Sequence, residues 1–260
     1  MQNNLLLMQT VRLYYAIHRS INLNKYIMIT IRKSEQRGYA EHGWLESFHS
    51  FSFAEYYDAA HMGYSVLRVI NEDKIAAGMG FGLHPHRDME IITYMLEGEL
   101  RHQDSMGNGA VIRAGDVQYM CAGTGVRHSE FNASTSYTAH LLQIWILPSE
   151  NNLPPSYEDK SISLESKLNQ WRLIASPNGG ADTLKVHQNM QLYATVLQVG
   201  KSLTYATQEN RCYYLQVARG SLTLNGMILS AGDAAQVSDE QLLDMSAVLE
   251  SEVLLFDLPV

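Results

Sequence analysis

The sequence contains little cysteine, little proline and no long apolar run. Its two cysteines, Cys121 and Cys212, lie in opposite halves of the 260-residue chain, which excludes a disulfide framework and favours two reduced thiols. No segment is long and apolar enough to predict a membrane-spanning helix. Reduced thiols and the lack of a recognisable secretory signal together predict a cytoplasmic protein.

Charged residues are also scarce, at 18% of the chain, and the acidic ones prevail. Lys and Arg together number 19, Asp and Glu number 27, and the net charge is −8. This balance argues against non-specific binding to nucleic acid or to an anionic membrane surface. The hydrophobic content of 46% is that of an ordinary globular protein. Independently of this composition, we expect a monomer.

The first 27 residues lack acidic side chains, although they contain Arg12, Arg19 and Lys25. We interpret residues 1–27 either as a basic leader or as the result of a start placed upstream of a true first residue, Met28. A compact strand pattern begins at Met28. We therefore expect residues 1–27 to lie outside the fold.

Short strand-like segments separated by turns dominate the rest of the chain. Segments 64–70, 90–96 and 143–147 are rich in β-branched and aromatic residues, and Gly, Asn and Asp occur between such segments. This spacing is typical of an all-β sandwich or barrel.

A weak internal repeat indicates two such units. Segment 96–100 resembles 217–222, and Ala-Gly-Asp follows each of them, at 114–116 and 231–233. Repeats of this kind determine the architecture. We predict two tandem β-barrels, at 28–150 and 166–260, joined by a linker at 151–165 whose first residues are rich in Asn and Pro.

Two short motifs carry metal-ligand chemistry. Residues two apart on a strand point to the same face, so His84 projects with His86, and His128 with Glu130. If the two strands face one barrel interior, three imidazoles and one carboxylate converge. Nitrogen and oxygen ligands without thiolate suit Fe(II), Mn, Co, Ni or Zn in an open catalytic site. Glu90 is a competing candidate, as a ligand in place of Glu130 or as a partner that orients a ligand.

The other histidines lack a partner at short spacing, and we interpret them as hydrogen-bonded structural residues. Within the predicted fold they are His42, His49, His61, His102, His140 and His187. The phenylalanines near His49 are more typical of core packing than of a substrate site. These are Phe48, Phe51 and Phe53.

Beyond these motifs, the chain from about Met28 to Pro259 resembles the pirin family, a bicupin group of the cupin superfamily. It is similar to bacterial pirin-like proteins described as quercetin 2,3-dioxygenases. The stretches that carry the resemblance include 42–45, 51–53, 67–71, 84–90, 102–107, 122–130 and 253–259. Gly98 lies one place later than the usual superfamily spacing, and Cys121 stands where the superfamily often has proline.

The resemblance implies two cupin barrels of the double-stranded β-helix, or jelly-roll, type. It implies a metal held by His84, His86, His128 and Glu130, with Fe(II) the usual ion and Zn, Mn, Co, Ni or Cu as alternatives. It also implies a second, degenerate cupin without metal. Aligning the repeat supports this, because Ala206, Gln208, Met245 and Ala247 fall opposite the four ligands and Cys212 opposite Glu90.

The resemblance further implies cleavage of a flavonol ring, as in quercetin, with dioxygen. The 3-hydroxyl of the flavonol would bind an open metal position, and a carboxylate would take its proton. Glu130 is the first candidate for this base and Glu90 the second. The alternative function is a metal- or redox-sensing protein that binds a transcription factor or a metabolic enzyme. A cupin isomerase or hydrolase is a third interpretation, since one fold hosts many activities.

Overall fold

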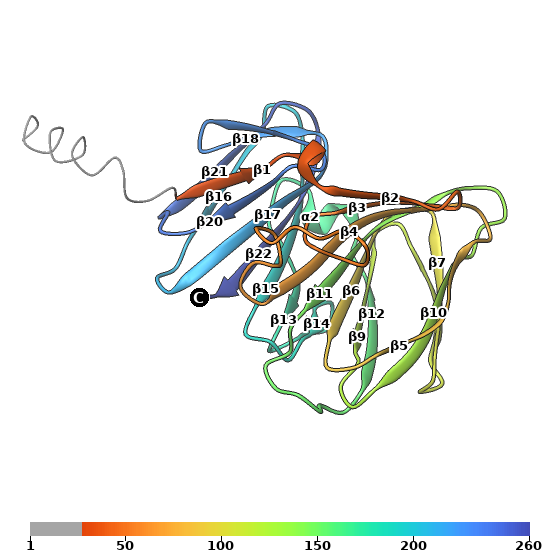
Figure 1. Ribbon diagram of the computed structural model, residues 1–260. Helices are drawn as coiled ribbons and strands as arrows, with labels where there is room; N and C mark the ends of the chain where they lie inside the picture. Colours follow the sequence, from red (N-terminus) through yellow and green to blue (C-terminus); the bar gives the residue numbers. More distant parts are fainter. Residues whose placement is uncertain (1–27) are drawn as a thin grey trace, which may run out of the picture.

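The computed structural model describes residues 28–260, which form two β-barrels side by side (Figure 1). The predicted leader at 1–27 lies outside the described residues. The strands of the first barrel are β2 (Gly38–Glu41), β3 (Leu45–His49), β4 (Leu67–Ile75), β5 (Gly80–His86), β6 (Glu90–Glu97), β7 (Glu99–Asp104), β8 (Gly109–Arg113), β9 (Asp116–Cys121), β10 (Val126–Asn132), β11 (Ala139–Ile146) and β12 (Ser156–Ser161). They form a seven-stranded sheet, β12-β9-β6-β11-β4-β3-β2, and a four-stranded sheet, β5-β10-β7-β8.

The second barrel repeats this plan. Its strands are β1 (Ile29–Arg32), β13 (Arg172–Ser176), β14 (Leu184–Lys185), β15 (Gln191–Leu197), β16 (Ser202–Ala206), β17 (Arg211–Arg219), β18 (Ser221–Leu224), β19 (Met227–Ser230), β20 (Ala234–Val237), β21 (Leu242–Ala247) and β22 (Ser251–Pro259). They form the sheets β1-β20-β17-β22-β15-β13-β14 and β16-β21-β18-β19. The helical elements are short: the 3-10 helix η1 (Ser34–Gln36) and α2 (Leu164–Lys167).

The predicted repeat corresponds to equivalent turns in the two barrels. Gly98 joins β6 to β7 at φ +73°, and Gly220 joins β17 to β18 at φ +82°. Both positions require a left-handed backbone, which glycine adopts without strain. The two Ala-Gly-Asp segments form the turns before β9 and β20. The all-β fold with two tandem barrels is confirmed.

Two edge strands differ from the predicted segmentation. Strand β1 pairs with β20 of the second barrel, although it begins the segment predicted as the first barrel. Strand β12 lies within the predicted linker and pairs with β9 of the first barrel. Pro154 and Pro155 precede β12, and its sequence SYEDKS is polar because the strand lies at a sheet edge with its side chains partly exposed.

The two barrels pack through the outer faces of their seven-stranded sheets. One apolar cluster contains Tyr94 and Tyr119 from the first barrel and Tyr214 and Phe256 from the second. The interior of the second barrel is filled by a single apolar cluster. The interior of the first barrel holds two smaller ones, and buried polar side chains such as Thr93 lie between them.

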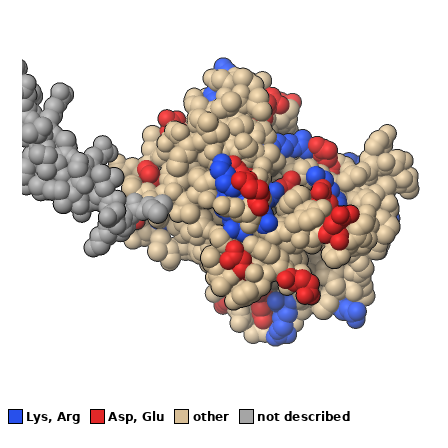
Figure 2. Space-filling view, turned by 45° about the horizontal axis from the view of Figure 1, so that its top comes forward, with Lys and Arg blue, Asp and Glu red and all other residues tan. Residues whose placement is uncertain are grey.

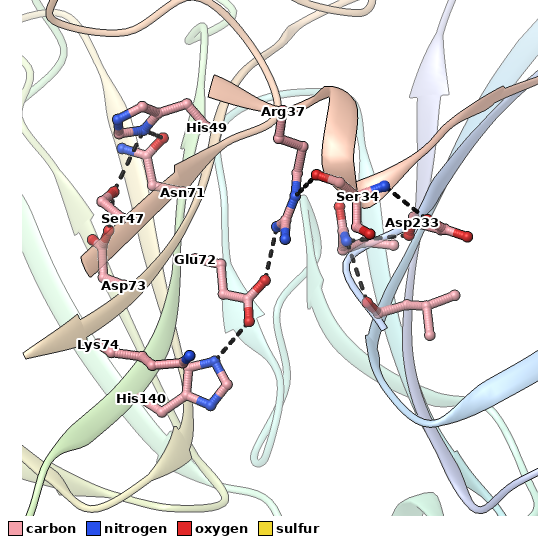
Figure 3. Close-up of polar contacts among 12 residues, drawn as sticks. Ser34, Arg37, Ser47, His49, Asn71, Glu72, Asp73, Lys74, His140 and Asp233 are labelled. Atoms are coloured by element: carbon pink, nitrogen blue, oxygen red, sulfur yellow. Dashed lines mark hydrogen bonds and ion pairs between the residues drawn. The ribbon is translucent and has the colours of Figure 1, made fainter. Parts of the chain in front are cut away.

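Polar contacts also join the barrels where the chain crosses from β1 to β2 (Figure 3). The Ser34 amide donates to Asp233 Oδ1 of the second barrel (2.8 Å). Arg37 donates to Glu72 Oε2 (2.7 Å), and His140 Nε2 lies 2.9 Å from Glu72 Oε1. Burial raises the pKa of Glu72, but His140 and the Arg37 charge outweigh it and lower this pKa from 4.5 to about 2.

We expect Glu72→Gln to weaken the pH dependence of stability. Because the folded-state pKa lies below the unfolded value, Glu72 stabilises the fold above about pH 4.5, and this contribution is lost as the pH falls towards 2. The shift corresponds to about 3 kcal/mol. Urea unfolding at pH 7 and pH 3 should show a smaller difference in unfolding free energy for Glu72→Gln than for wild type. Exposed Glu209→Gln serves as the control, and equal pH dependence in wild type and Glu72→Gln would contradict the assignment.

The distribution of charged side chains on the surface is mixed, in keeping with the modest net negative charge. Figure 2 shows Lys and Arg interspersed with Asp and Glu on the face that it presents, without a broad area of one sign. Within residues 28–260, no helix has the length and apolar character needed to cross a bilayer.

Candidate metal centre

Strands β5 and β10 place three imidazoles together inside the first barrel. The strands are antiparallel with His128 opposite His84, and the two-residue period of β5 brings His86 to the same face. The ring centroids of the three histidines are 4.4–4.8 Å apart. One nitrogen of each ring lies within 4.8 Å of the others. The structure thus brings together the three histidines that the sequence singled out.

Glu130 adjoins this group through His128. Burial alternates strictly along β10, so both side chains point inward. Opposite them, β5 holds one extra residue, because the pairing steps from His128–His84 to Glu130–Phe81. This β-bulge lets Phe81, His84 and His86 all face the interior. Ligand atoms of Glu130 and His128 lie within 4.8 Å of each other.

A chain of hydrogen bonds orients the Glu130 carboxylate. Thr93 Oγ1 donates to Gln143 Oε1 (3.0 Å), and Gln143 Nε2 donates to Glu130 Oε2 (2.9 Å). The first contact determines which way the Gln143 amide faces. Gln143 therefore donates to Oε2 of Glu130, and Oε1 has no hydrogen-bond partner within residues 28–260.

Two buried ligand atoms have no hydrogen-bond partner within residues 28–260: His128 Nε2 and Glu130 Oε1. Leaving a buried polar atom unpaired costs about 1–3 kcal/mol, so the pair indicates a missing ligand. His84 Nδ1 lies 2.7 Å from the Gly82 carbonyl; donation there leaves Nε2 as the free lone pair. The nitrogen and oxygen donors and the absence of thiolate fit a divalent metal ion.

Burial sets the charge states of these groups. It lowers the pKa of His86 to about 4 and that of His128 to about 2, with the neighbouring histidines adding to the effect. Both rings are therefore neutral at pH 7, which is the form that binds a metal. Burial raises the pKa of Glu130 to about 7, and Asp73 contributes to this shift.

His102 adjoins the candidate metal centre, a position that its spacing in the sequence did not reveal. It is fully buried, stacks on Tyr157 with centroids 4.8 Å apart, and places Nδ1 3.4 Å from His128 Nδ1. Its Nε2 lies 3.3 Å from Asp104 Oδ2. Donation to Asp104 leaves His102 Nδ1 as an acceptor for His128, which keeps His128 Nε2 free for a metal. The register of β7 against β10 brings these residues together, since Asp104 pairs with His128 and His102 pairs with Glu130.

We expect His102→Phe to weaken metal affinity about 10–100-fold, because loss of a partner that orients a ligand has effects of this size. Phenylalanine keeps the ring stacked on Tyr157 but cannot accept from His128. Competition with a chelator of known affinity measures the change, with His61→Ala as the control. His102→Asn, which retains an acceptor, should recover part of the affinity. Unchanged affinity in His102→Phe would remove this role.

Glu90 lies elsewhere. The chain turns at Asp88, where φ is +48°, and Glu90 begins β6 in the other sheet. His86 and Glu90 would share a face only on one regular strand. The turn at Asp88 interrupts the strand between them, so they do not. The Glu90 carboxylate accepts from Tyr119 Oη (2.5 Å) and from the amides of His187 (2.7 Å) and Gln188 (2.9 Å). Its position joins the two barrels rather than serving the metal centre.

The histidine group opens into a cavity of about 510 Å³, a volume typical of small-molecule sites. His84, His86 and Glu130 line it, and its aromatic walls are Trp44, Phe53, Phe81 and Trp145. Contrary to the sequence interpretation, Phe53 borders this cavity. His42 and His49 border it as well, and His49 is hydrogen-bonded to Asn71 as predicted. Phe51 does belong to the core, and Phe48 lies beneath the Arg37 guanidinium. The sequence gave no indication that Phe53, His42 and His49 line the cavity, because the spacing of residues along a strand does not show which of them border a cavity.

Positions of the second barrel that match the ligands are apolar or peripheral. Met245 and Ala247 are buried among its core residues, and Ala206 is exposed at the end of β16. Within residues 28–260, groups of three or more potential ligands occur in the first barrel alone.

Each barrel matches a family model, and the two models describe related proteins. The family model described as Pirin matches residues 30–146, and the one described as Quercetinase C-terminal cupin domain matches residues 173–258. A protein of Escherichia coli (strain K12) named quercetin 2,3-dioxygenase is 49% identical over 233 residues, which cover 89% of this chain and 99% of that protein. A pirin-like protein of Caulobacter vibrioides is 39% identical, covering 88% of this chain and 99% of that one.

A solved structure supports the same relationship. The crystal structure of the bacterial pirin YhhW from Escherichia coli in complex with nickel(II) is 49% identical and has a TM-score of 0.85. It covers 89% of this chain and 99% of that one. The divalent metal in that relative accords with the donor set described above.

Proposed function

This chain belongs to the pirin family, and we propose that it is a metal-dependent dioxygenase that opens the flavonol ring of quercetin-type substrates. The observation that carries the proposal is the group of three histidines and a buried carboxylate at an aromatic-lined cavity. The relative named quercetin 2,3-dioxygenase supports it. Dioxygen is the oxidant, and the expected products are a depside and carbon monoxide.

We propose that His84, His86, His128 and Glu130 hold one divalent ion, with Fe(II) as the first candidate. When bound, the ion supplies Lewis acidity that lowers the pKa of the substrate 3-hydroxyl. Zn, Mn, Co, Ni or Cu could occupy the same donors, because the ion bound in the cell depends on availability as much as on affinity.

The residues of the chain have separate tasks in this scheme. Trp44, Phe53 and Trp145 line the cavity, where they would contact a planar ring system and exclude water. Glu130 accepts the proton of the 3-hydroxyl through Oε1, which keeps a second lone pair available beside the metal position because Gln143 donates to Oε2 alone. Removing this proton makes the flavonol ring electron-rich at the carbon that reacts with dioxygen.

The proposal is tested with protein loaded with Fe(II) under anaerobic conditions and then mixed with quercetin and dioxygen. We expect the flavonol absorbance band to disappear with matching oxygen uptake, and a His84→Ala/His86→Ala variant to show neither. A folded, loaded protein that consumes no oxygen would refute the enzyme and favour a metal-sensing role.

A further inference from the structure

A row of polar side chains crosses the inner face of the seven-stranded sheet in the first barrel. Its members, Gln118, Thr93, Gln143, Asn71 and His49, are direct cross-strand partners from β9 through β6, β11 and β4 to β3. The row separates the two apolar clusters of the barrel interior. It is visible only once the strand register is known.

The two halves of this row have different partners. Gln118 contacts His102 and Gln143 holds Glu130, so the β9–β11 half supports the metal centre. The other half continues into Ser47 and Asp73, which form a second cross-strand pair. We call Ser47, His49, Asn71 and Asp73 the β3–β4 polar cluster (Figure 3).

The β3–β4 polar cluster is bonded within itself. His49 Nδ1 lies 2.8 Å from Asn71 Oδ1, and Ser47 Oγ donates to Asp73 Oδ1 (2.5 Å). All four residues are at most 4% exposed, yet all four line the cavity that also contains His84 and His86. None of them touches a metal-ligand candidate through a hydrogen bond within residues 28–260.

Burying a carboxyl group is costly unless it is both hydrogen-bonded and paired with a charge, and Asp73 contacts a hydroxyl rather than a cation. The same inner face carries Leu45 and Ile75 directly beside them, within an apolar cluster, so apolar residues are accommodated on these strands. A cluster with no part in holding the metal, facing the cavity, is most simply explained by a polar group of the ligand.

The unused atoms define the chemistry of that ligand group. Within the described residues, Asp73 accepts one side-chain hydrogen bond and His49 has a second ring nitrogen without one. Acceptors of this kind select a donor, such as a phenolic hydroxyl. The carboxyl groups of Asp73 and Glu130 both border the cavity and disfavour an anionic ligand such as a keto acid.

We propose that the β3–β4 polar cluster is a specificity subsite that binds a ring hydroxyl of the aromatic ligand, separate from the hydroxyl directed to the metal. The proposal rests on the function proposed above, since it assumes an aromatic ligand in this cavity. It assigns Ser47 and Asp73 to recognition of hydroxylated ring systems, and the Glu130 side of the cavity to the reaction.

The test compares two flavonols that share the metal-binding unit: quercetin, which carries additional ring hydroxyls, and 3-hydroxyflavone, which lacks them. Dissociation constants are measured by calorimetry on metal-loaded protein without oxygen. We expect wild type to bind quercetin about tenfold more tightly, as expected for a hydrogen bond to a buried carboxylate. Ser47→Ala and Asp73→Asn should reduce that ratio to near one.

The control is Ser251→Ala, which removes a buried hydroxyl from the second barrel and should keep the wild-type ratio. Equal affinities of wild type for both flavonols would overturn the subsite, as would an unchanged ratio in both variants. The wild-type comparison holds even if a variant fails to fold. Oxygen uptake is measured in parallel: preference without uptake refutes the proposed reaction alone, and uptake without preference refutes the subsite alone.

Discussion

Replacing His128 by alanine is expected to abolish tight metal binding and, with it, the proposed turnover of flavonols. His128 is the most buried of the three clustered histidines, and its Nε2 has no other partner among the described residues. His128 also belongs to both groups of potential ligands, one with His84 and His86 and one with Glu130. Without it, no shared ligand joins the two groups. Metal content by elemental analysis and oxygen uptake measure the two effects.

The matched control for this variant is His187→Ala. His187 is exposed, and it contacts Glu90 through its backbone amide rather than its ring. Metal content and turnover of the control should equal those of wild type. A His128→Ala protein that retained one tightly bound metal ion would show that the centre lies elsewhere.

The second large effect is expected from Glu130→Gln, which should lower kcat by about 10²–10⁴-fold, the range typical of a lost general base. The amide is nearly isosteric but cannot accept the proton, and its NH₂ group competes with Gln143 for the same contact. The affinity for quercetin without oxygen, measured on protein that carries one metal ion per chain, should change much less than kcat, because His84, His86 and His128 still hold the ion and the cavity walls remain. Steady-state oxygen uptake and anaerobic calorimetry give the two values.

Glu90→Gln separates the two carboxylates that the sequence left as candidates for the base. Because Glu90 joins β6 to the backbone at 187–188, its loss should lower the melting temperature while kcat per folded protein persists. If Glu90→Gln lost kcat and Glu130→Gln kept it, the two roles assigned here would be reversed.

Periodicity predicted the central features of the site. A repeat of two along a strand places His84 with His86 and His128 with Glu130, and the structure has both pairs facing the barrel interior. The internal repeat likewise predicted two barrels, since equivalent glycine turns recur in each.

The features that sequence reasoning missed depend on strand register. His102 and the β3–β4 polar cluster each contribute one or two ordinary polar residues to a strand, and they become a network only when neighbouring strands align. Glu90 was placed by assuming one continuous strand, but the turn at Asp88 starts a new sheet. Edge strand β1 pairs with the second barrel instead of the first, and edge strand β12 forms within the predicted linker, because edge pairing leaves little trace in composition.

The most direct test is a crystal structure of the protein soaked with Fe(II) or nickel(II), with anomalous scattering recorded at the absorption edge of the metal. We predict one strong peak in the first barrel, about 2.0–2.3 Å from nitrogens of His84, His86 and His128 and from an oxygen of Glu130. Soaked crystals with no peak between β5 and β10, or with a peak bound by other side chains, would contradict the account.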